Sequence, residues 1–288
     1  MRYAYYPGCS LEATGRPYEE SVAAVSKALG IELVELEDWN CCGATAYMSI
    51  NETLSFSLSA RNLCQAKKIG DTLVTACSAC YTNLRKTETY LAEFPEIKSK
   101  VNTSLAEAGL SYDGGIVTKH FLQTVVEDVG LDHVKSLVKH QLSGLRVAPY
   151  YGCQIARPYG IEDDADNPTM MDKLLMAIGA TPTYYPMKTV CCGGSLMGIR
   201  KDVALRLCRN ILLCAQQYDA QCIAVTCPLC QMNLDAFQSS INKTYGTSFK
   251  IPIVYFTQLM GVAFGLDSKG LGLKDCIVSA TEVAARYA

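Results

Sequence analysis

The chain has 288 residues, 49% of them hydrophobic, which is enough for one large core or two medium-sized ones. A net charge of -2 gives no support to nucleic-acid binding. Apolar runs such as residues 253–266 are too short to cross a bilayer. The amino terminus lacks the apolar core of an export signal and reaches a cysteine at once, so we expect a cytoplasmic protein without a membrane span.

Strands alternate with helices along the first half of the chain. Short β-rich segments are separated by segments whose apolar residues recur at helical spacing, and Gly30 and Gly70 are typical helix ends. We expect strands over residues 2–6, 31–36 and 72–75, and helices over residues 18–29, 53–69 and from Cys77 onward. Residues 91–110 have no counterpart in the second half and are expected to be helical and peripheral.

The second half follows the same order of elements. We expect strands over residues 146–150, 183–185 and 222–226, and helices over residues 170–178, 204–218 and from Pro228 onward. Alternation of strand and helix favours a mainly parallel sheet in each half. The predicted fold class is therefore α/β, with two homologous α/β halves.

The two halves repeat one pattern of cysteines and their neighbours. The matched segments are residues 5–9 with 149–153, 41–43 with 191–193, 77–84 with 227–234, and 120–123 with 255–258. Self-similarity over this length predicts two copies of one unit, related by a pseudo-two-fold axis. The polar run 139–144 separates them, so the predicted domains are residues 1–142 and 143–288.

Fifteen cysteines are the most informative feature of the composition. Disulfide-dense proteins are usually small and secreted, whereas this chain is large, has an odd number of cysteines and shows no export signal. Clustered cysteines in a reducing compartment more often bind metal or take part in redox chemistry. We therefore favour metal or cluster binding over structural disulfides.

Ten of the cysteines form two sets of five, which we call the first and the second quintet. The first quintet is Cys9, Cys41, Cys42, Cys77 and Cys80, and the second is Cys153, Cys191, Cys192, Cys227 and Cys230. Each member lies where a strand gives way to a loop or helix, and in a parallel α/β unit these points gather at one edge of the sheet. Helix starts near Cys77 and Cys227 favour thiolates, and Gly43, Gly193 and Gly194 let the backbone bend around a bulky group.

Five cysteines per half are one more than a tetrahedral zinc ion or an ordinary cubane cluster needs. The excess leaves two alternatives, an unusual cluster that uses all five thiols or a four-ligand cluster with a spare thiol. Zinc that merely staples each half is a third alternative, and it leaves the fifth cysteine without a role.

A family resemblance appears at these residues. The pattern C-x31-CC-x34-C-x-x-C, repeated as C-x37-CC-x34-C-x-x-C with CCG in both halves, resembles the cysteine-rich CCG-domain proteins. Residues 191–197, 226–234 and 270–273 are similar to the B subunit of heterodisulfide reductase within that family. The resemblance covers the whole chain. It implies that each half is a CCG domain whose five cysteines hold a non-cubane [4Fe-4S] cluster, with a substrate disulfide between the two clusters.

The resemblance also implies a reaction and partners. A disulfide needs two electrons to become two thiols, whereas iron–sulfur clusters deliver electrons singly, so a pair of clusters suits the reaction. The sequence contains no flavin or nicotinamide motif, so the electrons would come from a ferredoxin-like C subunit fed by a flavin-containing A subunit. The identity of the disulfide, on a small molecule or a carrier protein, and the direction of the reaction stay open. The competing functions are an electron relay in a flavin dehydrogenase complex and a zinc-stapled assembly module.

Residues outside the quintets have weaker interpretations. His120 could donate a proton to a departing thiolate, although a structural role is favoured, and His133 and His140 are expected to face solvent. Lys188 and Arg200 could attract an anionic substrate or be ordinary surface residues. Tyrosines beside the cysteines are expected to pack around the bound group. The cysteines expected to be buried apolar residues and not ligands are Cys64, Cys208, Cys214, Cys222 and Cys276.

Overall fold

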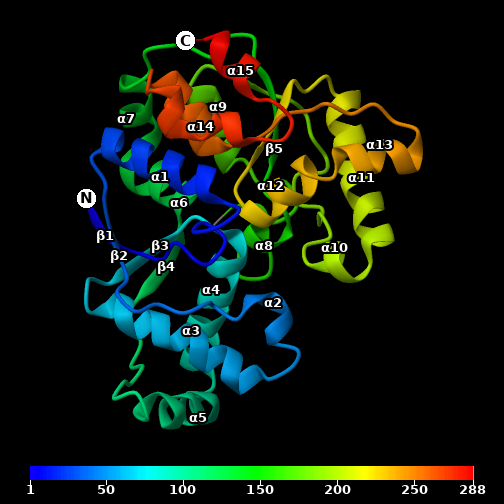
Figure 1. The fold of residues 1–288 in the computed structure, drawn as a ribbon. Helices are drawn as coiled ribbons and strands as arrows, with labels where there is room; N and C mark the ends of the chain where they lie inside the picture. The colour runs from blue at the N-terminus through cyan, green and yellow to red at the C-terminus, as the bar shows by residue number, and fades with distance from the viewer. Residues whose placement is uncertain (162, 288) are drawn as a thin grey trace.

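Two four-stranded parallel sheets organise the protein, as the computed structural model of residues 1–161 and 163–287 shows (Figure 1). The strand order is β2-β1-β3-β4 in the first sheet and β6-β5-β7-β8 in the second. The strands are β1 (Arg2–Tyr5), β2 (Glu32–Glu35), β3 (Thr72–Thr75), β4 (Val117–His120), β5 (Arg146–Tyr150), β6 (Thr181–Pro182), β7 (Cys222–Val225) and β8 (Ile253–Tyr255). The repeated order confirms the predicted fold class of two homologous α/β halves.

Helices connect the strands and cover the sheets. In the first half they are α1 (Arg16–Leu29), α2 (Ala44–Tyr47), α3 (Glu52–Lys67), α4 (Ser78–Glu93), α5 (Pro95–Ala106), α6 (Phe121–Gln123), the π-helical η1 (Thr124–Gly130) and α7 (Leu131–Ser136). In the second half they are α8 (Cys153–Ala156), α9 (Met170–Ala177), α10 (Leu196–Ile199), α11 (Lys201–Gln217), α12 (Pro228–Asp235), α13 (Gln238–Tyr245), α14 (Phe256–Ala263), the 3-10 helices η2 (Ser268–Leu271) and η3 (Leu273–Asp275), and α15 (Thr281–Ala285).

Local sequence signals explain where the main elements begin and end. Pro17 lies in the first turn of α1, and Gly30 ends that helix in the left-handed conformation with φ of 70°. The side chain of Asn51 caps α3 by accepting a hydrogen bond from the N–H of Leu54. All four residues of the central strand β7 are buried, as expected for a parallel sheet covered on both faces.

The two halves pack against each other reciprocally. Helix α1 of the first half lies beside α14 of the second half, and α9 of the second half contacts α6 and α7 of the first (Figure 1). Tyr18 of α1 stacks on Tyr255 with ring centroids 4.0 Å apart, and the hydroxyls of Ser21 and Thr257 are 2.6 Å apart. One hydrophobic core therefore runs through both halves, with the exchange of equivalent contacts that a pseudo-two-fold axis produces.

One strand differs from its predicted place. The third element of the second half was expected as a strand over residues 183–185, but β6 consists of Thr181 and Pro182. The N–H of Thr183 still donates to the carbonyl of Val147, 2.9 Å away. Two residues farther along β5, on the same side of the strand, Pro149 has no N–H to offer. The ladder therefore ends, and Tyr184 is exposed beyond it.

The segment that has no counterpart in the repeat is helical and peripheral, as predicted. Helix α5 packs on α3 and α4 and buries only Val101 and Leu105. The predicted domain boundary between residues 142 and 143 lies in the connection between α7 and β5 and stays a prediction. None of the helices in the described part of the chain combines the length and hydrophobicity that crossing a membrane would require.

Candidate metal centres

The ends of three parallel strands bring each quintet together. Cys9 follows β1, the pair Cys41 and Cys42 follows β2, and Cys77 follows β3 as the residue that precedes α4. The cysteines of the second quintet hold the equivalent places after β5, β6 and β7. Carboxyl ends of neighbouring parallel strands share one edge of a sheet, so residues distant in the sequence meet there. Every cysteine of the chain is free of disulfide bonds.

Four of the five sulfurs of the first quintet lie in two close pairs. Cys9 Sγ lies 4.0 Å from Cys41 Sγ, and Cys42 Sγ lies 3.7 Å from Cys80 Sγ. Cys9 and Cys41 are exposed, whereas the other three are buried. The set therefore has an open mouth and a closed inner end.

The second quintet repeats the inner contact of the first. Cys192 Sγ lies 3.5 Å from Cys230 Sγ, as Cys42 Sγ lies 3.7 Å from Cys80 Sγ in the first half. Cys191 is exposed and Cys153 partly so, and the remaining members are buried. The structure thus brings together all ten cysteines that the sequence pattern selects.

Glycine allows the closest approach of backbone to thiol in each half. A Cβ on Gly8 would lie 2.8 Å from Cys80 Sγ, and one on Gly152 would lie 3.1 Å from Cys230 Sγ. Both glycines have a positive φ, 74° in each case. The repeat shows that a glycine precedes the first cysteine of each quintet. Its contact with Cys80 or Cys230, which lies far away in the sequence, becomes visible only in the folded chain.

We expect Gly8→Ala to lower the iron content of the first half. Gly30→Ala is the matched control, because Gly30 has a φ of 70° but nothing within 4 Å of its added Cβ. Left-handed backbone strain costs each variant about 1–2 kcal/mol of unfolding free energy, measurable in urea. Only Gly8→Ala also displaces the Cys80 thiol, so iron should fall in that variant alone. Equal iron contents in the two variants would contradict this role of Gly8.

Amide N–H groups point at the buried sulfur of each CCG loop. Asn83 and Asn233, three residues after each C-x-x-C, place their Nδ2 atoms 3.5 and 3.6 Å from the sulfurs of Cys42 and Cys192. Charge-assisted bonds of this kind stabilise a thiolate and tune a cluster. These asparagines lie within the matched segments 77–84 and 227–234, and their fixed distance from both C-x-x-C motifs was the available sequence signal.

The backbone of the second CCG loop makes similar bonds to sulfur. The N–H groups of Gly193 and Gly194 donate to Cys191 Sγ and Cys192 Sγ at 3.3 and 3.5 Å. Gly194 has a φ of 50°, and Ala44, at the equivalent position of the first half, has a φ of 49° despite its side chain. The two loops therefore adopt the same turn.

Hydrogen bonds among the thiols shift their pKa values in opposite directions within each quintet. Bonds from neighbouring thiols lower the pKa of Cys42 and of Cys192 below the ordinary thiol value. The same bonds, helped by burial, raise the pKa of their partners Cys80 and Cys230. The bond from Cys153 lowers the pKa of Cys191 to about 6. The shifts thus agree between the halves at Cys42 and Cys192 and at Cys80 and Cys230, whereas the pKa of Cys41 is raised, opposite to that of its equivalent Cys191.

Two tyrosines tie the strand ends to the CCG loops. The hydroxyl of Tyr6 donates to the carbonyl of Asn40 at 2.9 Å, and that of Tyr150 donates to the carbonyl of Val190 at 2.6 Å. Each acceptor is the residue directly before a Cys-Cys pair. Their rings also pack in the core, so these tyrosines combine the predicted packing with a loop-fixing bond.

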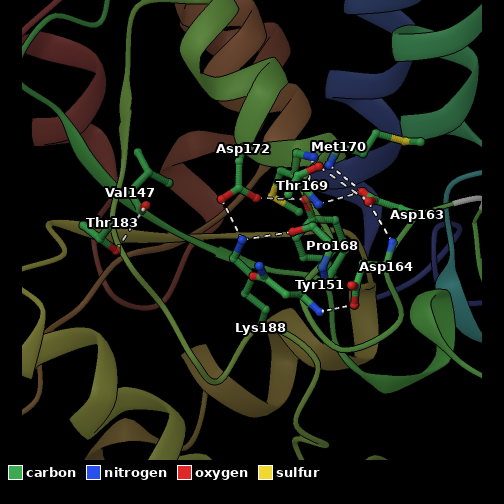
Figure 2. A network of polar contacts seen from close by, with 12 residues as sticks. Val147, Tyr151, Asp163, Asp164, Pro168, Thr169, Met170, Asp172, Thr183 and Lys188 are labelled. Carbon is green, nitrogen blue, oxygen red and sulfur yellow. Dashed lines mark hydrogen bonds and ion pairs between the residues drawn. The ribbon is translucent and has the colours of Figure 1, made fainter.

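A buried ion pair fixes the cysteine loops of the second half (Figure 2). Lys188 Nζ lies 2.7 Å from Asp172 Oδ1 and 2.9 Å from the carbonyl of Pro168. The hydroxyl of Tyr151 donates to the other oxygen of Asp172 at 3.0 Å. The carbonyl of Lys188 accepts from the N–H groups of Tyr151 and Gly152, each at 2.9 Å. This network joins the segment before Cys153 to the segment before the second CCG loop.

The structure corrects one interpretation of Lys188. Its side chain is 9% exposed and paired, so it neither attracts a substrate from solvent nor belongs to the ordinary surface. The first half has Asp38 at this position, and it pairs instead with Arg61. Arg200 does lie on the surface, where it forms an ion pair with Asp202.

The five cysteines outside the quintets are buried, as expected. Cys208 comes closest to the second quintet, and its thiol donates to the carbonyl of Cys192 at 3.2 Å. In the first half Ser59 donates to the carbonyl of Cys42 at 3.1 Å. The Cys208 thiol therefore makes the same hydrogen bond in the second half that the Ser59 hydroxyl makes in the first. Burial raises the pKa values of Cys208 and Cys222, which keeps these thiols neutral.

His120 lies between the two halves and is fully buried. Its Nδ1 accepts from the N–H of Leu122 at 3.1 Å, so the ring proton is on Nε2. Nε2 lies 3.1 Å from the carbonyl oxygen of Ala76 and 3.2 Å from that of Thr226. Burial lowers the pKa of His120 to about 4, which makes the ring neutral. His133 and His140 are exposed, as predicted.

The donor set of each quintet fits an iron–sulfur cluster. Free thiols are the ligands that such clusters use. The cysteines of each set come from three chain segments, each of which follows a different strand of the same sheet. In residues 1–161 and 163–287, no group of three or more His, Cys, Asp or Glu side chains has the arrangement of a site for a single metal ion. The glycines at Gly8 and Gly152 leave open the space that a Cβ beside the sulfurs would fill.

Comparison with known proteins places these features in a family. The cysteine-rich domain model (CCG) matches residues 3–85 and 147–235, one match in each half. A solved structure, a hypothetical protein from Helicobacter pylori, superimposes with a TM-score of 0.78 over 98% of this chain and 52% of its own, at 16% identity. This chain thus spans about half the length of that protein, and the likeness concerns the fold.

Relatives match over nearly the full length of the chain. The 8-methylmenaquinol:fumarate reductase membrane anchor subunit of Wolinella succinogenes is 32% identical over 98% of this chain and 98% of its own. A protein of Archaeoglobus profundus that is named as like the B subunit of heterodisulfide reductase is 30% identical over 99% and 98%. The B subunit of the ferredoxin:CoB-CoM heterodisulfide reductase of Methanosarcina mazei is 27% identical over 99% and 96%. The chain therefore belongs to the cysteine-rich (CCG) domain family and is homologous to the B subunit of heterodisulfide reductase.

Proposed function

We propose that the chain is the iron–sulfur subunit of a heterodisulfide reductase-like complex and reduces, or reversibly forms, a disulfide. The observation that carries the proposal is the pair of complete quintets with matching sulfur contacts, 3.7 Å between Cys42 and Cys80 and 3.5 Å between Cys192 and Cys230. In this proposal each quintet holds one non-cubane [4Fe-4S] cluster through all five thiols. A pair of such clusters supplies two single electrons, which is what cleavage of an S–S bond consumes.

The residues around the sulfurs prepare the sites for this role. The glycines Gly8 and Gly152 let the backbone approach the thiols, and Asn83 and Asn233 donate to sulfur. The inner thiols are shielded from water, whereas the outer ones are exposed at the mouth of each site. A disulfide would therefore reach the sites from the side of Cys9, Cys41 and Cys191.

The proposal includes partners and a location. The relative from Methanosarcina mazei is named as one component of a heterodisulfide reductase, so we include a ferredoxin-like C subunit and a flavin-containing A subunit as electron donors. Fifteen free cysteines need a reducing compartment, and we therefore assign the chain to the cytoplasm.

A second candidate is supported by the relative from Wolinella succinogenes, which is named as the membrane anchor subunit of a reductase. In this alternative the chain carries both clusters but relays electrons for a flavin-containing partner and turns over no disulfide. The same quintets serve both functions, so the geometry of the sulfurs does not separate them.

Two measurements test the proposal. Purified chain, loaded with iron and sulfide without oxygen, should contain about eight irons and eight sulfides. Dithionite-reduced protein should then reduce a disulfide panel, which includes the mixed disulfide of coenzymes M and B, and a candidate thiol should change the EPR signal of the oxidised protein. Full clusters without any turnover favour the relay, and zinc without sulfide contradicts both candidates.

A further inference from the structure

The two quintets meet at the centre of the molecule. Cys77 and Cys227, equivalent members of the two sets, lie beside each other there, because the hydroxyls of their neighbours Ser78 and Thr226 are 3.1 Å apart. Both side chains are buried, so this contact is closed to solvent. The two quintets therefore approach each other at their buried inner ends.

His120 lies on the first-half side of this contact region, the seam, where the segments around Cys77 and Cys227 meet. Its single Nε2–H is shared by the carbonyl oxygens of Ala76 and Thr226, at 3.1 and 3.2 Å. These two residues directly precede Cys77 and Cys227. One ring thus holds the backbone of both C-x-x-C segments at the point where they meet.

Further donors converge on the same carbonyl of the second half. The hydroxyls of Ser78 and Tyr18 lie 3.3 and 3.4 Å from the carbonyl oxygen of Thr226. The Thr226 hydroxyl donates to the carbonyl of Tyr151 at 3.0 Å, which links the seam to the start of the second quintet. His120 bonds to the residue before each C-x-x-C segment, Ser78 reaches Thr226 from within the first C-x-x-C segment, and Tyr18 bonds to Thr226 alone.

The pseudo-symmetric position does not repeat this arrangement. Tyr255 ends β8 as His120 ends β4, and its N–H donates to Gln258, as the N–H of His120 donates to Gln123. The hydroxyl of Tyr255 has no hydrogen-bond partner among the described residues. The seam is therefore held by one histidine rather than by a symmetric pair.

We propose that His120 is a positioning residue that keeps the two cluster sites in contact, so that their clusters are coupled across Cys77 and Cys227. The inference rests on the proposed presence of two clusters. Coupling would let an electron delivered to one cluster reach the other, with no bond made or broken. Two electrons, supplied by dithionite or by the partner iron–sulfur subunit, would then reduce both clusters of the chain.

The test uses two substitutions that differ in reach. Glutamine places an N–H₂ group near the position of Nε2, so H120Q keeps donors for both carbonyls. Asparagine keeps an acceptor near Nδ1 for the N–H of Leu122 but is too short to reach Ala76 and Thr226, so it removes the clamp alone. Tyr255→Phe is the matched control, because it removes a hydroxyl that makes no hydrogen bond to any described residue.

The readout is the EPR spectrum of intact, iron-loaded protein in the state where both clusters carry an unpaired electron. We expect the splitting or broadening of a spin–spin interaction in the native protein, in H120Q and in Y255F, and its loss or marked weakening in H120N with iron unchanged. Two independent signals in the native protein, or an unchanged interaction in H120N, overturn the inference.

Two further arms separate the possible failures. If H120N does not fold, Ser78→Ala removes one of the donors to Thr226 and should weaken the interaction in part. An unchanged interaction in S78A then overturns the clamp. Iron for fewer than two clusters in the native protein would instead contradict the proposed function.

Discussion

Replacing Cys80 by serine should remove the iron of the first half and leave that of the second. Cys80 is buried, and its sulfur contacts Cys42 at 3.7 Å, so serine removes a thiol at the closed inner end of the site. We expect iron to fall from about eight to about four per chain, with acid-labile sulfide falling in parallel. Cys230→Ser should remove the other half of the iron, and disulfide reduction should be lost in both variants.

The same measurement decides whether all five thiols bind. Cys9→Ser and Cys153→Ser should also lose iron if the cluster uses the whole quintet, whereas a four-ligand cluster with a spare thiol would keep it. Cys64→Ser is the control, because the Cys64 thiol donates to the carbonyl of Ser111, a bond that a serine can also make. Full iron in C80S would contradict the assignment of the quintet.

Lys188→Met should be the most destabilising charge substitution in the second half. It leaves Asp172, whose side chain is 17% exposed, without the cation 2.7 Å from its oxygen. Removing one partner of a buried ion pair costs about 3–5 kcal/mol, because the remaining charge loses water and partner together. Urea unfolding of the metal-free protein measures this loss.

A double variant separates charge from packing at this site. Lys188→Met with Asp172→Leu removes both charges and should recover most of the lost stability. Lys135→Met breaks the exposed pair with Asp132, and should change the unfolding free energy by no more than about 0.5 kcal/mol. A loss below about 1 kcal/mol in K188M would mean that the pair does not support the fold.

Much of the fold could be predicted because each half follows local rules. Periodicity and helix-ending glycines located α1 and α3, and β7 lies within the strand expected over residues 222–226. The convergence of the quintets followed from parallel topology, since their members sit at strand ends. The place of β6 did not follow, because its end depends on Pro149 in a neighbouring strand, a feature of pairing that a local pattern does not contain.

The polar residues behind the cysteines were harder to predict, because their partners are distant in the sequence. Lys188 looks like a surface residue until α9 places Asp172 beside it. His120 carries the sequence signature of an acid–base residue, but its two ring nitrogens are occupied by backbone groups. Comparison of the two halves does show that both positions differ between them. Lys188 is equivalent to Asp38, and His120 is equivalent to Tyr255.

The reciprocal packing of the halves has a consequence for how such a molecule can diversify. In a homodimer, a residue beside the axis always meets its own copy, so a histidine at the seam would face a second histidine. Fusion of two units into one polypeptide lifts that constraint, and equivalent positions can differ, as His120 and Tyr255 do. The residues around each quintet can then change independently, while the common hydrophobic core holds the two halves in the same relative position.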